Sequence, residues 1–254
     1  MNRSLNIMLV GESWFTYSIH QKGFDTFQTA EYTEGATEFI AGLERLGHGV
    51  RYIPAHRVDA EFPANAGEFT GVDAIILSDV GANTFLLTKK TFNESQIVPN
   101  RLEALRSYVL GGGGLLMVGG YMSFAGIDGK ARYGSSPLAD VLPVSVKNHD
   151  DRIEVPEGFT ATVRDAAHPA LAGVPGRWPR LLGYNQVVAR DDSIVLVSRG
   201  DDPILAVATF GSGRSAAFTP DLAPHWAPPE FVAWEAYPRL WDSLLRWLAH
   251  SGNT

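Results

Sequence analysis

The sequence contains no cysteine. This absence excludes disulfide bonds, thiolate nucleophiles, and zinc or iron–sulfur sites with cysteine ligands. It is compatible with a cytoplasmic location, which we expect for this protein. Positive charge is also scarce, because 21 lysines and arginines stand against 28 acidic residues and give a formal net charge of −7. No cluster of basic residues offsets this balance, so we expect no nucleic-acid partner.

Long hydrophobic runs are missing as well. No stretch approaches the roughly 20 apolar residues that a membrane-spanning helix needs, so we expect no membrane partner. The apolar run within the first segment, MNRSLNIMLVG, has the length of a strand rather than of a signal-peptide core. The length of 254 residues suits either one large α/β domain or two small ones.

Predicted strands alternate with amphipathic helices in the first half of the chain. The strands are expected at Leu5–Val10, Val50–Ile53, Ala74–Leu77 and Leu115–Val118. One helix is expected from about Glu34 to Leu46, and another after Asn100, which is a good N-cap residue. The segment between the first strand and the first helix, Gly11–Tyr32, is expected to be a long polar and aromatic loop. This order predicts an α/β fold with a three-layer, doubly wound, mostly parallel sheet of the flavodoxin-like type.

The pattern changes after Tyr121. Glycines and prolines become frequent, and only short apolar segments such as Val141–Val146 and Phe159–Val163 remain. We expect residues from about 122 to 190 to form an elaborated, β-rich insertion that packs on the same core. The whole chain, 1–254, is therefore expected to be a single domain.

The last part of the chain returns to a regular pattern. Strands are expected at Ile194–Val197, Ile204–Thr209 and Ser215–Thr219. The glycines of Gly211-Ser212-Gly213 between the last two predict a hairpin. A final helix is expected from about Glu230 to His250, with a kink at Pro238.

Chemically reactive residues follow four of the predicted strands. Because the carboxyl ends of parallel strands form the usual ligand site of an open α/β sheet, we expect these residues to surround a pocket for a small molecule. The candidate catalytic residues are Asp79, His225 and Glu12. The candidate ligand-binding residues are Ser13, Trp14, His20, Gly81, Asn83, Gly120, Tyr121, Arg132, Tyr133, Asp221 and Trp226.

Several of these residues also have a purely structural alternative. Asp79 can orient a histidine, act as a general base or cap its own turn. His225 stands beside Trp226 in a proline-stiffened loop, where it can transfer protons, stack on a ligand or bond a backbone carbonyl. Arg132 and Tyr133 can contact an anionic or hydroxyl-rich ligand, or they can tie down their own loop.

Motifs for cofactors and metals are not found. The glycines of Gly111–Gly114 fit neither the dinucleotide-binding nor the P-loop spacing. The acids and histidines near the strand ends match no metal-ligand pattern such as H-E-x-x-H. We therefore expect no cofactor and no metal. Ser78 lies in S-D-V-G rather than in the G-x-S-x-G elbow of serine hydrolases, which favours a structural serine.

Eight segments carry a resemblance to a known family: LVGESW, HQKGFDTF, ILSDVGANT, GGGLLMVGGYMSFAGIDGKARYG, DDRIEVPEG, LLGYN, DDPILAV and PHWAPPEFVAWEAYPRLW. Together they resemble the class I glutamine amidotransferase-like proteins, bacterial cytoplasmic proteins of mostly uncharacterised function. The resemblance covers nearly the whole chain. It implies a single domain with a flavodoxin-like three-layer fold.

The resemblance does not extend to the reaction. Class I amidotransferases place a cysteine on the turn after the third strand and a His-x-Glu pair after a late strand. Here that turn reads Leu77-Ser78-Asp79-Val80-Gly81, and Glu230 follows His225 by five positions. A thiolate is needed to attack the glutamine amide, so we expect no glutaminase activity.

The favoured function is binding of a small polar metabolite at the carboxyl edge of the sheet. If the protein is an enzyme, we expect acid–base chemistry with His225 and Asp79 as the proton-transfer pair and Glu12 assisting. The architecture is also similar to that of trehalose-utilisation ThuA-like proteins and of the trimerisation domain of some bacterial β-galactosidases, which points to a carbohydrate ligand. The alternatives are a non-catalytic binding or homo-oligomeric assembly module, and a metal-assisted or acid–base hydrolase or lyase.

Overall fold

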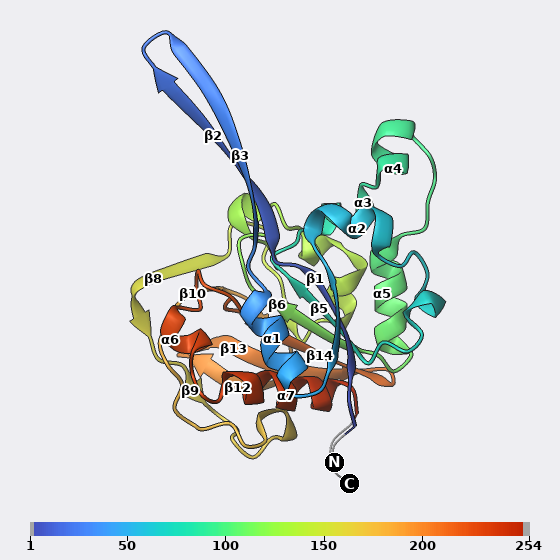
Figure 1. Cartoon of the computed structure of the whole chain (residues 1–254). Coiled ribbons are helices and arrows are strands. Elements are labelled where there is room, and N and C mark those ends of the chain that lie inside the picture. The colour runs from blue at the N-terminus through green and yellow to red at the C-terminus, as the bar shows by residue number, and fades with distance from the viewer. Residues whose placement is uncertain (1–2, 251–254) are drawn as a thin grey trace.

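The computed structural model describes residues 3–250 and is built around an eight-stranded sheet (Figure 1). The strands stand in the order β4-β1-β5-β6-β14-β13-β12-β9. The parallel part consists of β4 (Gly49–Ile53), β1 (Asn6–Gly11), β5 (Ala74–Ser78), β6 (Gly114–Val118) and β14 (Gly213–Phe218). The antiparallel edge consists of β13 (Asp202–Phe210), β12 (Ile194–Arg199) and β9 (Thr162–Val163). The prediction of a mostly parallel α/β sheet is confirmed.

Helices cover both faces of this sheet. The longer ones are α1 (Thr37–Arg45) and α7 (Tyr237–Leu248) on one face and α5 (Arg101–Leu110) on the other. The shorter ones are α2 (Val58–Glu61), α3 (Ala82–Leu86), α4 (Lys89–Glu94) and α6 (Pro229–Val232). Because side chains alternate along a strand, Leu9 of β1 belongs to the first core and Met8 to the second. Among the helices of residues 3–250, none is long and apolar enough to cross a membrane.

The helix caps follow from local sequence. The side-chain Oδ1 of Asn100 accepts hydrogen bonds from the backbone N–H of Leu102 and Glu103, at 3.0 and 3.3 Å, which confirms the predicted N-cap of α5. The first helix begins at Thr37 rather than at Glu34. It begins later because Glu34 still belongs to a strand, where it pairs with Ser13.

The predicted loop at Gly11–Tyr32 is wrong, because this segment is a β-hairpin. Its strands, β2 (Ser13–Lys22) and β3 (Asp25–Glu34), pair antiparallel at all ten positions. The hairpin extends away from the body of the molecule (Figure 1), and we call it the arm. Aromatic and small polar residues alternate along the arm, as in a strand. The arm packs no face on the core, however, so its sequence lacks the regular apolar side by which a half-buried strand is recognised.

The prediction of one continuous C-terminal helix is also wrong. Residues 229–248 form two helices, α6 and α7, with a break at residues 233–236. Pro238 lies in the first turn of α7. Proline is tolerated there because the backbone N–H that it lacks would have no partner in the helix. Pro238 therefore starts a helix instead of kinking one.

Four strands of the glycine-rich region lie outside the main sheet, whereas β9 belongs to it. Two small antiparallel pairs join β8 (Arg152–Phe159) to β10 (Leu181–Asn185) and β7 (Val144–Ser145) to β11 (Val188–Ala189). The predicted hairpin at Gly211-Ser212-Gly213 is confirmed, since β13 and β14 pair up to Phe210 and Gly213.

Candidate functional site

Two neighbouring strands end in acidic residues with left-handed backbone. Glu12 directly follows β1 with a φ of 49°, and Asp79 directly follows β5 with a φ of 44°. The two turns are joined, because the backbone N–H of Glu12 donates to the carbonyl of Ser78 at 2.8 Å. This conformation costs a non-glycine residue about 1 kcal/mol or more and tends to occur at functional sites. The carboxyl edge of the sheet is therefore the candidate site.

Glu12 is enclosed under the base of the arm. Only 2% of the residue is exposed, and its Oε2 accepts a hydrogen bond from the Ser78 hydroxyl at 2.5 Å. Gly35 lies against it so closely that a Cβ there would be 2.7 Å from Glu12 Oε1. Burial, together with the charges of Asp221 and Asp79, raises the pKa of Glu12 well above its usual value. Burial and the neighbouring carboxylates thus favour the protonated form of Glu12.

Asp79 ties the end of β5 to the loop after β6. Its Oδ1 accepts a hydrogen bond from the backbone N–H of Met122 at 2.6 Å, and its own N–H donates to the Ser123 hydroxyl at 3.1 Å. Gly120 must be glycine here, because its φ is +142° and a Cβ would lie 2.8 Å from Asp79 Oδ1. Burial raises the pKa of Asp79, and the Met122 hydrogen bond opposes that rise.

Asp221 follows β14 and completes a group of three carboxyl groups. It is 4% exposed, and its Oδ1 accepts from the backbone N–H of Ala223 at 3.2 Å. Its Oδ2 lies 3.6 Å from Nδ1 of His225, whose side chain is 41% exposed. Burial, and then the charge of Asp79, raises the pKa of Asp221 to about 8. The three acids therefore do not all carry charge at neutral pH, and the charge of one affects the ionisation of the others.

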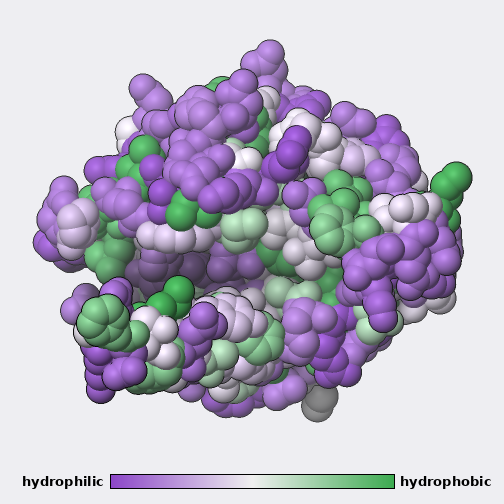
Figure 2. All heavy atoms as spheres, turned by 90° about the horizontal axis from the view of Figure 1, so that it is seen from above, coloured by the Kyte–Doolittle hydropathy of each residue, from purple (hydrophilic) through white to green (hydrophobic). Residues whose placement is uncertain are grey.

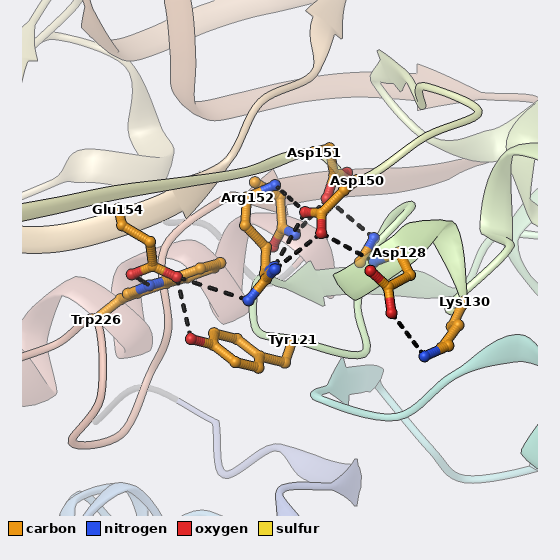
Figure 3. A network of polar contacts seen from close by, with 10 residues as sticks. Tyr121, Asp128, Lys130, Asp150, Asp151, Arg152, Glu154 and Trp226 are labelled. Atoms are coloured by element: carbon orange, nitrogen blue, oxygen red, sulfur yellow. Dashed lines mark hydrogen bonds and ion pairs between the residues drawn. The ribbon is translucent and has the colours of Figure 1, made fainter.

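Two aromatic rings contact His225, and a carboxylate from β8 holds both of those rings, Tyr121 and Trp226, in place (Figure 3). The His225 ring stacks on Trp226 at 5.1 Å between centroids and meets the edge of Tyr121 at 4.6 Å. Both neighbours are anchored by Glu154, whose carboxylate accepts from the Tyr121 hydroxyl at 3.1 Å and from Trp226 Nε1 at 2.9 Å. The guanidinium of Arg152 lies 4.5 Å from the centre of the Tyr121 ring. We call Tyr121, His225 and Trp226 the aromatic wall.

A buried pair fixes the loop after β6 from the same side. Asp151 accepts hydrogen bonds from the backbone N–H of Ala125 and Gly126, both at 2.9 Å, and from Asn185 Nδ2 at 2.7 Å. The Oδ1 of Asn185 accepts in turn from the N–H of Gly120 at 3.0 Å. Sequence reasoning did not identify Asp151, Arg152, Glu154 or Asn185 as site residues. Their only signal was that they fall in the segments DDRIEVPEG and LLGYN.

The structure brings together the predicted residues Glu12, Asp79, Gly120, Tyr121, Asp221, His225 and Trp226. Trp226 is only 1% exposed, so it supports the wall rather than offering a free face. Figure 2 views this end of the molecule and displays a recess with hydrophilic residues in its depth and hydrophobic residues at its border. Within residues 3–250, no group of three or more histidine, aspartate or glutamate side chains has the geometry to hold a metal ion.

Two predicted residues lie on the arm instead. Trp14 is at its base, and His20 is near its tip, where it stacks on Phe27 at 4.5 Å and lies 3.1 Å from the Thr29 hydroxyl. The placement of His20 among the strand ends is corrected, because ten paired positions carry it along the arm.

Other predicted residues have structural partners. Ser13 Oγ accepts from the backbone N–H of Ala55 at 2.8 Å and helps to seat the arm. Tyr133 is 0% exposed and donates to the Val80 carbonyl at 2.5 Å, so it has no surface for a ligand and that prediction is corrected. Gly81 is buried and precedes α3.

Arg132 and Asn83 are exposed. Arg132 is left-handed, with a φ of 62°. With Lys147 and Asn148 it lines a cavity of about 390 Å³. The Lys147 ammonium donates to the side chain of Gln186, and no ion pair engages Arg132 in the described part of the chain. The cavity therefore contains an exposed arginine on a protein of net negative charge.

Comparison with known proteins agrees with this architecture. The family model described as "Putative glutamine amidotransferase" matches residues 6–250. The chain is similar to the solved structure of "Cytoplasmic Protein STM3548 from Salmonella typhimurium", with 43% identity, a TM-score of 0.93, and coverage of 96% of this chain and 99% of that one. "Cytoplasmic Protein STM1381 from Salmonella typhimurium LT2" is similar at 42% identity, with a TM-score of 0.92 and the same coverage. A "Putative thua-like protein" from Bacteroides uniformis shares the fold alone, at 12% identity and a TM-score of 0.57, with coverage of 96% of this chain and 91% of that one. A search of curated proteins finds no match.

Proposed function

The chain belongs to the glutamine amidotransferase-like family, and from this premise we propose that it is a member without glutaminase activity that binds a small polar metabolite and acts on it by acid–base chemistry. The observation that carries the proposal is the convergence of Glu12, Asp79 and Asp221 beside His225. The acids follow three different parallel strands. Open α/β sheets build their ligand sites from residues in these positions.

Asp79 takes the position where the resemblance places the nucleophilic cysteine. It is left-handed and lies between a buried strand and a short helix, as the nucleophile of an elbow does. A carboxylate there cannot form the thioester of a glutaminase, but it can take up a proton or bind a hydroxyl group. The geometry of the elbow therefore supports a site in which a carboxylate that binds or accepts protons replaces the thiolate nucleophile of a glutaminase.

Asp221 and His225 have complementary roles in this proposal. With a pKa of about 8, Asp221 is largely protonated at neutral pH and can donate a proton to a ligand as a general acid. His225 lies 3.6 Å away and is exposed, so it can exchange protons with both the ligand and solvent. Because burial raises the pKa of Glu12, this residue resists adding a further negative charge to the group. An acid–base hydrolase or lyase reaction fits this arrangement.

The surroundings of the site favour a carbohydrate-like ligand. The half-buried ring of Tyr121 offers a face of the kind on which sugar rings pack, and the carboxyl groups bind hydroxyls. The cavity beside Arg132 belongs to the loop that follows β6, and we place a charged or hydroxyl-rich end of the ligand there. Exposed Asn83 and Trp14 are the further candidates for contact.

We also propose a fold type, a domain organisation and a cellular location for the chain. Helices on both faces and the strand order support a flavodoxin-like, doubly wound classification. Packing of β9 in the main sheet supports one domain in which residues of about 122–190 are an elaboration. The similarity to two proteins described as cytoplasmic supports a cytoplasmic location.

Ligand-induced thermal shifts test the proposal. The protein is heated alone and with a panel of sugars, sugar acids and polyols, and the same panel is applied to Asp221→Asn and Asp79→Asn. We expect the wild type to respond to at least one compound and both variants to lose that response. Asp140→Asn is the matched control, because Asp140 forms an exposed ion pair with Arg106 outside the strand-end group. An unchanged response in both site variants would contradict the proposal.

A further inference from the structure

Two positively charged side chains line the cavity beside the loop that follows β6. Arg132 and Lys147 are the charged residues of its lining, and we call them the cation pair. Within residues 3–250, the guanidinium of Arg132 has no hydrogen bond or ion pair. The Lys147 ammonium donates to the neutral side-chain amide of Gln186 and forms no ion pair in the same range. Both charges are therefore left without a direct counter-ion, although the protein carries a formal net charge of −7.

The backbone places the cation pair on two segments that pack against each other. A Cβ on Gly129 would be 3.5 Å from the carbonyl oxygen of Asn148, and a Cβ on Gly134 would be 3.2 Å from that of Val146. One member of the cation pair lies between the two glycines in sequence, and the other lies between the two residues that face them. Like charges on facing segments repel each other, and an anion between them relieves the repulsion. The arrangement therefore favours a negatively charged occupant.

The acids of the two segments already have other partners. Asp128 forms an ion pair with Lys130 at 2.7 Å, and Asp150 forms one with Arg152 at 2.8 Å (Figure 3). Asp151 is buried and accepts hydrogen bonds from two backbone N–H groups and one side-chain amide. Among the described residues, no acid belongs to the lining of the cavity. The positive charge of the cation pair is therefore available to a ligand.

A chain of side-chain hydrogen bonds holds Lys147 in position. Its partner Gln186 donates from Nε2 to both carboxylate oxygens of Asp202, each at 3.0 Å. Asp202 also accepts from the Tyr184 hydroxyl at 2.6 Å, and the oxygen of that hydroxyl accepts from the guanidinium of Arg199 at 3.2 Å. The carboxylate of Asp202 is thus bonded to other donors rather than to Lys147. Because Lys147 is fixed before a ligand arrives, binding costs little of its conformational entropy.

The backbone of Arg132 fits a binding role better than a structural one. Its φ of 62° is left-handed, a conformation that glycine and asparagine adopt more readily than arginine does. An arginine there, with an unpaired guanidinium, stabilises the fold less than asparagine would. Residues held in such a conformation tend to occur where a ligand binds.

The donors of the cavity suit a phosphate group. Arginine offers paired N–H donors and lysine offers an ammonium. Asn148 lines the same cavity, and because its Oδ1 lies 3.1 Å from Nδ1 of His149, its amide N–H groups remain as a third donor. A phosphate monoester carries a charge of about −1.5 to −2 at neutral pH and three terminal oxygens, which match two cations and three donor groups. A carboxylate has a single charge and two oxygens. The cavity volume of about 390 Å³ is within the range of small-molecule sites.

We propose that this cavity is a phosphate site and that the ligand of the strand-end acids is a phosphate monoester, with its phosphate on the cation pair. The second part rests on the proposed function, because that function places the rest of the ligand at Asp79 and Asp221. The loop after β6 joins the two sites, since Met122 is bonded to Asp79. Further along this loop, the carbonyl of Ala131 accepts at 2.9 Å from the N–H of Ala82, the first residue of α3. A sugar phosphate has the chemistry of both sites.

Isothermal titration of the full chain with inorganic phosphate, at a constant ionic strength of about 0.15 M, tests the phosphate site by itself. We expect the wild type to bind, and Arg132→Asn and Lys147→Gln each to bind about tenfold or more weakly, because each loses a charge-assisted hydrogen bond. Lys130→Gln is the matched control, since it removes a positive charge from the same loop outside the cavity lining. It should bind almost as tightly as the wild type, because salt screens exposed charges. The melting temperature of Arg132→Asn should equal or exceed that of the wild type, which separates loss of binding from loss of folding.

Two further titrations identify the ligand class. Acetate is the carboxylate probe, and we expect it to bind about tenfold or more weakly than phosphate, because it loses a charge-assisted contact. A set of sugar monophosphates is compared with the parent sugars and with inorganic phosphate. At least one sugar phosphate should bind more tightly than both of its parts. Arg132→Asn and Asp221→Asn should each lose this advantage, whereas Asp221→Asn should keep the wild-type affinity for inorganic phosphate.

Three results would overturn the phosphate site. The first is a wild type that does not bind inorganic phosphate. The second is an unchanged affinity in Arg132→Asn and Lys147→Gln, and the third is acetate binding as tight as that of phosphate. Failure of the proposed function gives a different result: the affinity for phosphate depends on the cation pair, but no sugar phosphate binds more tightly than inorganic phosphate. That result would overturn the second part of the inference and leave the phosphate site in place.

Discussion

Replacing Asp221 by asparagine should make the protein more stable at neutral pH. Asp221 is 4% exposed. Burial, and then the charge of Asp79, raises its pKa from 3.8 to about 8. Above about pH 4, the unfolded chain releases this proton while the folded chain keeps it. Stability from this group is therefore complete below the unfolded pKa and is lost progressively as the pH rises toward the folded value.

The size of the effect follows from the width of this pH window. Each pKa unit corresponds to about 1.4 kcal/mol, so keeping the proton at pH 7 costs at most about 4 kcal/mol of unfolding free energy. The linked ionisation of Glu12 and Asp79 reduces the cost, and we expect asparagine to recover about 2–4 kcal/mol. Asparagine has the shape of the protonated acid, and its Oδ1 can still accept the hydrogen bond that Ala223 now gives to Asp221.

Urea unfolding between about pH 4 and pH 8 measures the difference. The free energy of unfolding of the wild type should fall across this range relative to that of Asp221→Asn, and the two should agree at the acidic end. The free energy of unfolding of Asp140→Asn should change with pH as that of the wild type does, because exposed ion pairs contribute about 0–1 kcal/mol. A variant that is less stable than the wild type at pH 8 would refute the reasoning, since it would mean that ionised Asp221 stabilises the fold.

Three other substitutions have expected outcomes. Gly120→Ala should lower the unfolding free energy in urea by about 2 kcal/mol or more, because the new Cβ would meet Asp79 at a φ of +142°; an unchanged value would contradict this. Asn185→Ala should cost about 2–3 kcal/mol in the same assay, because Asp151 loses one of its three hydrogen bonds and the buried Gly120 N–H loses its partner. His225→Ala should change stability by less than about 0.5 kcal/mol but abolish the ligand-induced thermal shift, and a retained shift would exclude His225 from the site.

The parts of the fold that could be predicted depend on short stretches of sequence. Buried parallel strands such as Ala74–Ser78 are continuous apolar runs, and Asn100 caps its helix through residues two and three positions away. The arm was missed because, beyond Ser13, its strands have no buried residue in the described part of the chain. Pro238 was misread because its position within a helix depends on where that helix begins.

The candidate site likewise has residues that could be predicted from the sequence and contacts that could not. Glu12, Asp79 and Asp221 could be predicted because each comes directly after a strand or within a few residues of its end. The contacts of the aromatic wall could not be predicted, because Glu154 and Trp226 are 72 residues apart in sequence. The hydrogen bonds of Asn185 likewise depend on the register of β8 and β10, which no local pattern determines.

The acids and the aromatic wall are anchored on separate parts of the chain. The acids belong to the turns of the central sheet, whose packing tolerates little change, whereas Glu154 orients two members of the wall from a strand outside that sheet. Substitutions along β8 can therefore remodel the wall while the sheet and its proton-carrying groups stay intact. Ligand specificity can therefore change, in evolution or by protein engineering, through substitutions that leave the central sheet unaltered.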